Sequence, residues 1–228
     1  MTEFRMGRFQ AIPPVVKNLI IINVLVFLAQ FTLKSNIDLD NLLSLWPFDS
    51  DSFRGYQIFT HMFAHGGWGH IIFNMFALWM FGSVLENLWG SKRFLIFYIA
   101  CGLGSAFLHL LIQHLRWEHA LQVLQSGDEA GARAIASTIG PALGASGAIM
   151  GLFVAFGYLF PNSELIILPI PFPIKAKYAV IIFMGIDLFG GIANVEGDNI
   201  AHFAHLGGAI AGLIIVWIWN RTNRRRFY

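Results

Sequence analysis

A few polar side chains stand in stretches of this sequence that are otherwise almost entirely apolar. Ser146 lies in the glycine-rich run Gly144–Gly151. His70 and Asn74 are four residues apart, and His205 begins another apolar run. A serine hydroxyl becomes a good nucleophile when a neighbouring base takes its proton, and histidine is the usual base. The oxyanion that then develops needs donors such as a backbone N–H, an amide or an imidazole. These residue types indicate acyl transfer by a Ser–His dyad.

The composition around these residues is that of a membrane protein. Hydrophobic residues make up 56% of the 228 residues, with 22 Phe, and charged residues only 12%. A soluble domain carries roughly twice that charged fraction. Mean hydropathy is +0.62, and a formal charge of +2 is too small to indicate a polyanionic partner. We therefore exclude a soluble enzyme, a disordered segment and a nucleic-acid binder, and the single Cys101 excludes an intrachain disulfide.

Six stretches are long and apolar enough to cross a bilayer, which takes about 20 residues as a helix. The sequence predicts an all-α polytopic membrane protein whose single domain covers residues 1–228. Short cytoplasmic tails are expected at 1–14 and 220–228. The expected spans are about 15–34, 68–88, 94–115, 142–160, 176–193 and 200–219.

Basic residues set the expected orientation. With both termini in the cytoplasm, eleven of the 15 Lys and Arg residues fall on that side, as the positive-inside rule requires. No organellar transit segment is recognisable ahead of the first span, so we expect a bacterial cytoplasmic (inner) membrane. The polar residues would then open to the outer, periplasmic side.

The even-numbered spans run through the membrane in the same direction, which brings their polar residues to a similar depth. The spans at 68–88, 142–160 and 200–219 all run from outside to inside, and each carries its polar residues within about two turns of its N-terminal end. Ionisable and polar residues inside spans mark functional sites by default. Glycines spaced by four, Gly147 with Gly151 and Gly208 with Gly212, would let two of these helices approach closely.

The motifs around these polar residues are similar to those of a known family. The pattern Gly144-x-Ser146-Gly147-Ala148-x-x-Gly151, followed by Ala204-His205-Leu206-Gly207-Gly208, resembles the rhomboid intramembrane serine proteases. The run from His61 through His65 and His70 to Asn74 carries the same resemblance.

The resemblance implies a nucleophile at Ser146 and a general base at His205. His70, Asn74 and the Ser146 backbone N–H would form the oxyanion hole. Implied partners are the lipid bilayer and single-span membrane proteins, which the family cleaves without cofactor or metal. Residues 178–199 would act as a lateral gate for those substrates.

The sequence departs from the family pattern in the first loop and beside the serine. Many members carry a Trp-Arg pair where Tyr56-Gln57 stands, and some have an aromatic residue in place of Met150. We assign no role to the third loop, 116–137, in which a short surface helix broken near Ser126–Gly127 is expected. The segment 161–175 holds four prolines and is expected to be an irregular connection.

Other interpretations compete for the same residues. A rhomboid-like protein that binds membrane clients without cutting them is the main alternative, and a transporter with a polar ion site is another. A metal site is another possible interpretation of several histidines, namely His61, His65 and His70 with His202 or His205. Because no HExxH pattern is present, we do not expect a metal site. Asp187 is an acid inside a span, and we interpret it as a structural or gating partner. A role as third catalytic member, orienting a histidine, is less favoured. His202 is left outside the catalytic set.

Overall fold

A computed structural model describes residues 9–166, 172–193 and 201–222. The chain is an all-α polytopic membrane protein, as the sequence predicts. Five helical segments are long and apolar enough to cross a membrane, and a sixth apolar helix is shorter, among the residues described. Whether six segments span therefore stays a prediction, as do the positions of the two termini.

The elements follow one another along the chain as helices with one short hairpin. The first part holds α1 Pro14–Leu33, α2 Leu39–Leu43, α3 Gln57–Thr60, η1 His61–Phe63, α4 Trp68–Ala77, η2 Leu78–Gly82 and α5 Ser83–Trp89. The second part holds α6 Ser91–Gln125, α7 Glu129–Ala136, α8 Ser146–Leu159, β1 Glu164–Leu165, β2 Ile174–Lys175, α9 Ala176–Ala193 and α10 His202–Thr222. The strands β1 and β2 pair antiparallel within the proline-rich segment, whose residues 167–171 lie outside the described part.

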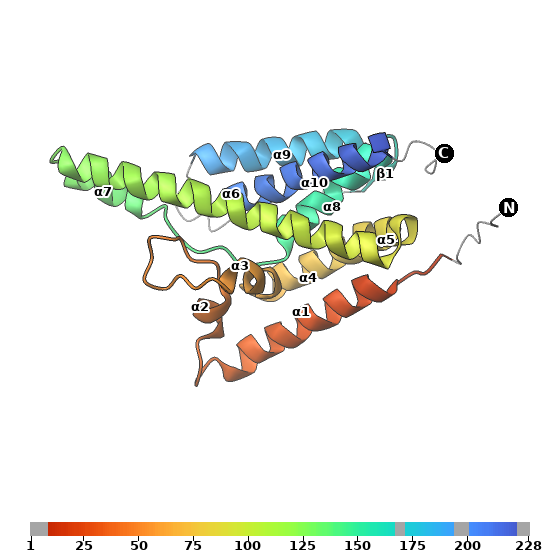
Figure 1. The fold of residues 1–228 in the computed structure, drawn as a ribbon, viewed down its shortest axis with the longest axis horizontal. Coiled ribbons are helices and arrows are strands. Elements are labelled where there is room, and N and C mark those ends of the chain that lie inside the picture. Colours follow the sequence, from red (N-terminus) through yellow and green to blue (C-terminus); the bar gives the residue numbers. More distant parts are fainter. Residues whose placement is uncertain (1–8, 167–171, 194–200, 223–228) are drawn as a thin grey trace.

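Helix α6 is longer than the expected span 94–115. It continues without interruption to Gln125, because no Gly or Pro occurs between Leu115 and Gly127, whose φ is +90°. Asp128 then caps α7 by accepting a hydrogen bond from the Gly131 N–H. The third loop is thus a helical hairpin that projects past the bundle (Figure 1).

Helix α8 begins later than the expected span 142–160. Ala142 is held in a two-residue bridge with Leu45 of the first loop, and the Gly144 N–H donates to the His61 carbonyl. Gly144 has φ +123°, a conformation that side-chain-bearing residues rarely adopt, so the helix cannot include it. The first helical residue is therefore Ser146. At 1.5 Å per residue, the 14 residues of α8 are about 21 Å long, less than a bilayer core.

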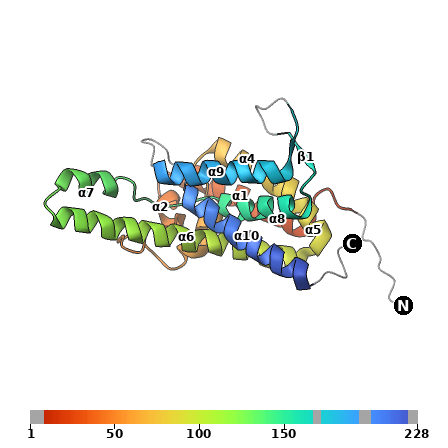
Figure 2. The same ribbon diagram turned by 90° about the horizontal axis from the view of Figure 1, so that it is seen from above.

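Helices α6, α8 and α10 form the centre of the bundle, and glycines set their separation. A Cβ added to Gly208 of α10 would overlap the Gly147 carbonyl of α8, and one added to Gly212 would come 2.7 Å from the Gly151 Cα. Gly207 meets the Gly104 carbonyl of α6 in the same way. Figure 2 shows α10 crossing α8 diagonally, with α9 along the other side of α8. The backbones are thus in direct contact where the helices cross.

Helix α1 lies along the opposite side of the bundle (Figure 1), and a carboxylate of α5 fixes its N-terminal end. The buried Glu86 of α5 accepts hydrogen bonds from the backbone N–H groups of Val15 and Val16, at 2.9 and 2.8 Å. These N–H groups belong to the first turn of α1, which has no intrahelical partner for them. The Ser91 hydroxyl donates to the same carboxylate.

Helix α9 is the least buried of the described span-length helices. It packs on α8, where a Cβ on Gly157 would meet Val180, and on the start of α10. Its last turn is also bound to α6, because the Arg116 guanidinium donates to the Gly191 carbonyl at 3.0 Å. Most of the expected gate, 178–199, is this helix, and residues 194–199 lie outside the described part.

The glycine crossing can be tested by adding one methyl group. We expect Gly208→Ala to lower the free energy of unfolding by about 1–3 kcal/mol, because the new Cβ overlaps a backbone carbonyl that cannot rotate away. Thermal unfolding in detergent micelles measures this as a lower Tm. Gly185→Ala in α9 is the matched control, since a Cβ there meets no atom within 4 Å. Equal Tm values for the two variants would contradict the packing described.

Candidate active site

Ser146 and His205 face each other across the α8–α10 crossing. The His205 Nε2 lies 2.9 Å from the Ser146 Oγ, a hydrogen-bond distance. Both side chains are only partly buried. The pair sits one residue from Gly147 in α8 and one turn before Gly208 in α10, at the point where the two backbones touch. Close packing at the glycines is therefore what brings the hydroxyl and the imidazole into contact.

The other ring nitrogen of His205 faces a carboxylate. The His205 Nδ1 lies 3.0 Å from the Asp187 Oδ1, and the His202 Nδ1 lies 2.8 Å from the same oxygen. Asp187 and His202 are both buried. A carboxylate only accepts hydrogen bonds, so each imidazole donates from Nδ1. The neutral His205 ring then keeps Nε2 as an acceptor for the Ser146 hydroxyl proton.

The structure thus joins two residues that the sequence interpretation left outside the catalytic set. One available signal was the three-residue spacing of His202 and His205, which puts both side chains on the same side of α10. A second was Asp187 itself, because an acid inside a span is costly unless it has a partner. Which helix face Asp187 points from depends on how α9 packs, and the sequence does not give that.

His70 lies on the other side of Ser146, against Gly144. A Cβ on Gly144 would come 2.7 Å from the His70 Nε2 and 3.5 Å from the Ser146 Oγ, so the glycine leaves the space between them open. The Gly66 N–H lies 3.3 Å from the His70 Nδ1 and donates to it. Neutral His70 therefore carries its proton on Nε2, the nitrogen that faces the serine side.

Asn74 is buried one turn beyond His70 in α4. Its Nδ2 donates to the His70 carbonyl at 2.9 Å, which holds the amide in place and uses one of its two N–H donors. A backbone donor lies nearby as well. Ser146 is the first residue of α8, and the first N–H groups of a helix have no intrahelical partner.

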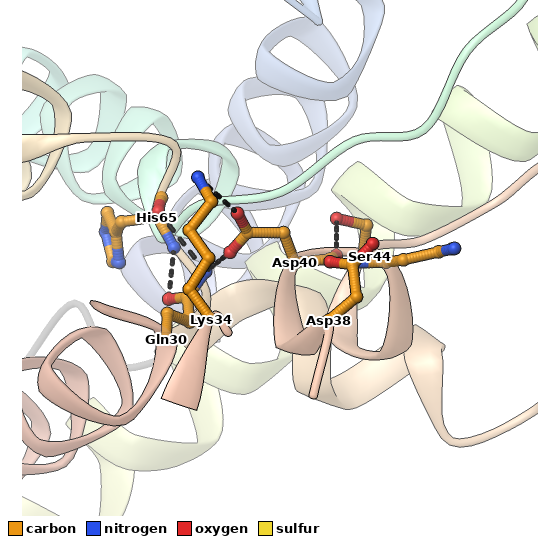
Figure 3. Close-up of polar contacts among 7 residues, drawn as sticks. Gln30, Lys34, Asp38, Asp40, Ser44 and His65 are labelled. Atoms are coloured by element: carbon orange, nitrogen blue, oxygen red, sulfur yellow. Dashed lines mark hydrogen bonds and ion pairs between the residues drawn. The ribbon is translucent and has the colours of Figure 1, made fainter. Parts of the chain in front are cut away.

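The first loop supports His70 through a polar junction between α1 and α2 (Figure 3). The Gln30 side chain accepts from the His65 N–H at 3.0 Å and donates to the Asp40 carboxylate at 2.5 Å. The His65 ring in turn packs edge-on against the His70 ring, with centroids 5.1 Å apart. Lys34 approaches the same Asp40 carboxylate at 3.9 Å. The end of α1 thus helps to fix the position of His70.

Gln57 anchors the loop at the place where many family members carry a Trp-Arg pair. Its buried side chain accepts from the Arg54 N–H at 3.0 Å and donates to the Ser52 carbonyl at 2.9 Å. Its backbone carbonyl lies 2.9 Å from the His61 Nδ1. One amide side chain therefore connects several turns of the loop, and this departure from the family pattern does not leave it unanchored.

Two loop histidines are buried and have no charged partner among the described residues. Burial lowers the pKa of His61 to about 4. Burial, and to a lesser degree the nearby His70 imidazole, lowers the pKa of His65 to about 4. Both rings are therefore neutral at pH 7. In the described ranges no group of three or more His, Cys, Asp or Glu side chains is placed to hold a metal ion.

In this helical membrane bundle a chain of hydrogen bonds links a serine, an imidazole and a carboxylate. Amide and imidazole donors lie beside the serine. Such a bundle and site define a class of intramembrane protein with a hydrolase-like site. Comparison with known families gives the particular one. Residues 52–222 match the Rhomboid domain, which is most of the chain, and the chain belongs to the rhomboid family. Proteins of this family are generally serine intramembrane proteases that act on membrane protein substrates within the bilayer.

Individual relatives are similar over much of the chain. RHOMBOID-like protein 12, mitochondrial, of Arabidopsis thaliana is 32% identical over 93% of this chain and 60% of its own length. Rhomboid protein 1, mitochondrial, of Saccharomyces cerevisiae is 28% identical over 75% and 43%. Presenilin-associated rhomboid-like protein, mitochondrial, of Homo sapiens is 30% identical over 66% and 34%. The chain thus spans only about a third to three-fifths of the length of these relatives.

These relatives correct the expected location. Placement in a bacterial cytoplasmic membrane is wrong, because the relatives carry mitochondrial names, while an integral membrane protein is supported. The expectation rested on the lack of a recognisable transit segment ahead of the first span, and the distribution of basic residues indicates only which way the helices run through a membrane. It carries no information about which membrane that is.

The buried loop histidines predict acid destabilisation. An unfolded His has a pKa of about 6.5, so between pH 6.5 and 4 the unfolded chain binds protons that folded His61 does not. Stability is full above that range and falls as the pH is lowered, by about 2–3 kcal/mol for His61 near pH 4.5. Denaturant unfolding at a series of pH values measures the slope of the free energy of unfolding against pH. We expect a shallower slope for His61→Gln and a wild-type slope for His119→Gln, a change at an exposed position of α6. Parallel slopes for all three proteins would exclude His61 as a source.

Proposed function

We propose that this protein is an intramembrane serine endopeptidase that hydrolyses peptide bonds in transmembrane segments of other membrane proteins. The observation that carries the proposal is the 2.9 Å contact between the Ser146 Oγ and the His205 Nε2. Family membership supports it independently. A rhomboid-like protein that only binds clients has no need of this pair, and both residues are present in hydrogen-bond contact.

The reaction proceeds in two halves. His205 takes the Ser146 proton at Nε2 while the Oγ attacks the carbonyl carbon of the scissile peptide bond. The tetrahedral intermediate collapses to an acyl-enzyme ester, and His205 gives the proton to the leaving amine. A water molecule then attacks the ester, again losing a proton to His205, and Ser146 recovers its proton when the acid product leaves.

Three donors beside Ser146 are suited to the oxyanion. They are the Ser146 N–H at the start of α8, the Nε2–H of His70 and the remaining amide N–H of Asn74. The positive end of the α8 dipole adds to them. Because these groups are held by Gly66, the His70 carbonyl and the helix itself, they need little rearrangement when charge develops.

The substrates in this proposal are single-span membrane proteins. A transmembrane helix hides its peptide carbonyls in hydrogen bonds, so residues that weaken the substrate helix favour cleavage. Entry past α9 fits its low burial, and α9 carries Asp187 into the site. By likeness to the relatives described above, we place the protein in a mitochondrial membrane.

Removal of either dyad member should abolish cleavage. We expect Ser146→Ala and His205→Ala to show no turnover of a single-span substrate in proteoliposomes, while both keep a Tm near that of the wild type. Ser126→Ala, at the exposed end of α6, is the serine control and keeps full activity. Cleavage is followed by gel electrophoresis with mass spectrometry of the products. Undiminished turnover in either dyad variant would refute the proposal.

Asn74 should contribute to kcat. Loss of one oxyanion donor costs about 10²- to 10³-fold in kcat, and we expect Asn74→Ala to fall in that range with KM nearly unchanged. The control is Asn220→Ala at the far end of α10. It removes a side-chain amide that is hydrogen-bonded to the Tyr158 hydroxyl, and so measures the general effect of losing an amide. A change confined to KM would assign Asn74 to substrate binding instead.

A further inference from the structure

We propose that Asp187 is a positioning residue that fixes the tautomer and ring orientation of His205, so that the site works as a Ser–His–Asp triad in which the carboxylate stays ionised. The inference rests on the proposed function, since it assigns Asp187 a part in the same reaction. It differs from the role favoured by the sequence, in which Asp187 only joins helices or controls the gate.

The geometry is that of a three-member chain. Ser146 Oγ, His205 Nε2, His205 Nδ1 and Asp187 Oδ1 follow one another with contacts of 2.9 and 3.0 Å on the two sides of the ring. The side chain of Asp187 is 7% exposed and that of His205 15% exposed. The carboxylate therefore lies deeper than the imidazole, and the imidazole lies between it and the serine. Asp187 does not contact the reacting atoms and acts through His205.

The chemical consequence follows from which groups can donate. An ionised carboxylate has no proton to give, so the His205 Nδ1 must carry the hydrogen in their contact. That leaves a lone pair on Nε2, directed at the Ser146 hydroxyl. When Nε2 takes the serine proton, the imidazolium is stabilised by the adjacent negative charge. The proton stays on the ring until it passes to the leaving amine, and Asp187 remains ionised throughout.

His202 gives the carboxylate a second donor. A buried carboxylate is costly unless it is hydrogen-bonded, and Oδ1 receives contacts from both imidazoles. The fit of His202 against α9 depends on Gly190, where a Cβ would come 2.5 Å from the His202 Nε2. His202 thus holds Asp187 in place between the two helices.

The same contacts also suit a purely structural role. In that alternative the Asp187–His202 pair only attaches α9 to α10, and the contact with His205 is incidental. The two roles make different demands on His202. For a structural attachment, loss of His202 costs as much as loss of Asp187. For a positioning role, the carboxylate matters far more than its second donor.

The test compares kcat and KM of Asp187→Asn and His202→Leu with the wild type on a single-span substrate in proteoliposomes. The amide of Asn can present its NH₂ group to Nδ1 and favour the wrong tautomer. We expect kcat to fall about 10²- to 10⁴-fold for Asp187→Asn, with KM within about threefold. His202→Leu removes the second donor toward Asp187, and we expect it to lose less than about tenfold in kcat. Asp187→Glu restores the carboxylate and should recover part of the activity.

Separate outcomes identify which claim fails. If Ser146→Ala still cleaves, the proposed function is wrong. If Ser146→Ala is inactive but Asp187→Asn keeps wild-type kcat, or if Asp187→Asn and His202→Leu lose equally, the positioning role is wrong and the proposed function stands.

A spectroscopic measurement on the wild-type protein covers the case in which Asp187→Asn does not fold. In ¹⁵N-histidine-labelled protein, the His205 signals are assigned by their loss in His205→Ala. A neutral ring protonated at Nδ1 is expected, and a neutral ring protonated at Nε2 would overturn the inference.

Discussion

The structure depends on direct backbone contact between α8 and α10. Polar groups inside an apolar bundle must find partners within the protein, and a short side chain such as Ser reaches a partner on another helix only where the two helices approach closely. Gly208 and Gly212 of α10 provide that approach, because a Cβ at either position would meet the α8 backbone, at Gly147 and at Gly151 respectively. The Ser146–His205 contact lies beside this crossing. The hydrogen bond between the two side chains therefore depends on the close packing at the glycines.

Around the crossing, polar groups of the site have defined hydrogen-bond partners. Asp187 approaches from α9, His70 and Asn74 from α4, and the first loop is attached to the end of α1 through Gln30 and His65. Each contact orients the next group, so that the serine hydroxyl is flanked by an acceptor on one side and by donors on the other. Preorganisation of this kind is what electrostatic stabilisation of an oxyanion requires.

Much of this arrangement follows from the sequence, and the remainder depends on tertiary packing. Membrane composition predicts helices, and helix parity brings Ser146, His70 and His205 toward one end of the bundle. Hydropathy alone does not reveal that Gly144 adopts a positive φ, which delays the start of α8 and leaves Ser146 at a helix N-terminus. Nor does it reveal the rotation of α9 that turns Asp187 toward His205, because α9 is mostly apolar on every face. The kind of membrane was wrongly expected, since residue charge distinguishes the sides of a bilayer and carries no label for the organelle.

The central claim is that the Ser146 hydroxyl is an activated nucleophile. The most direct measurement is the reaction of the purified protein with a fluorophosphonate probe, with the labelled residue located by mass spectrometry. An activated serine forms a covalent phosphonate ester, whereas ordinary serine hydroxyls do not react. We predict a single modified residue, Ser146, and no modification when His205 is replaced by alanine. Absence of labelling in the active-site peptide, or equal labelling with and without His205, would contradict the account.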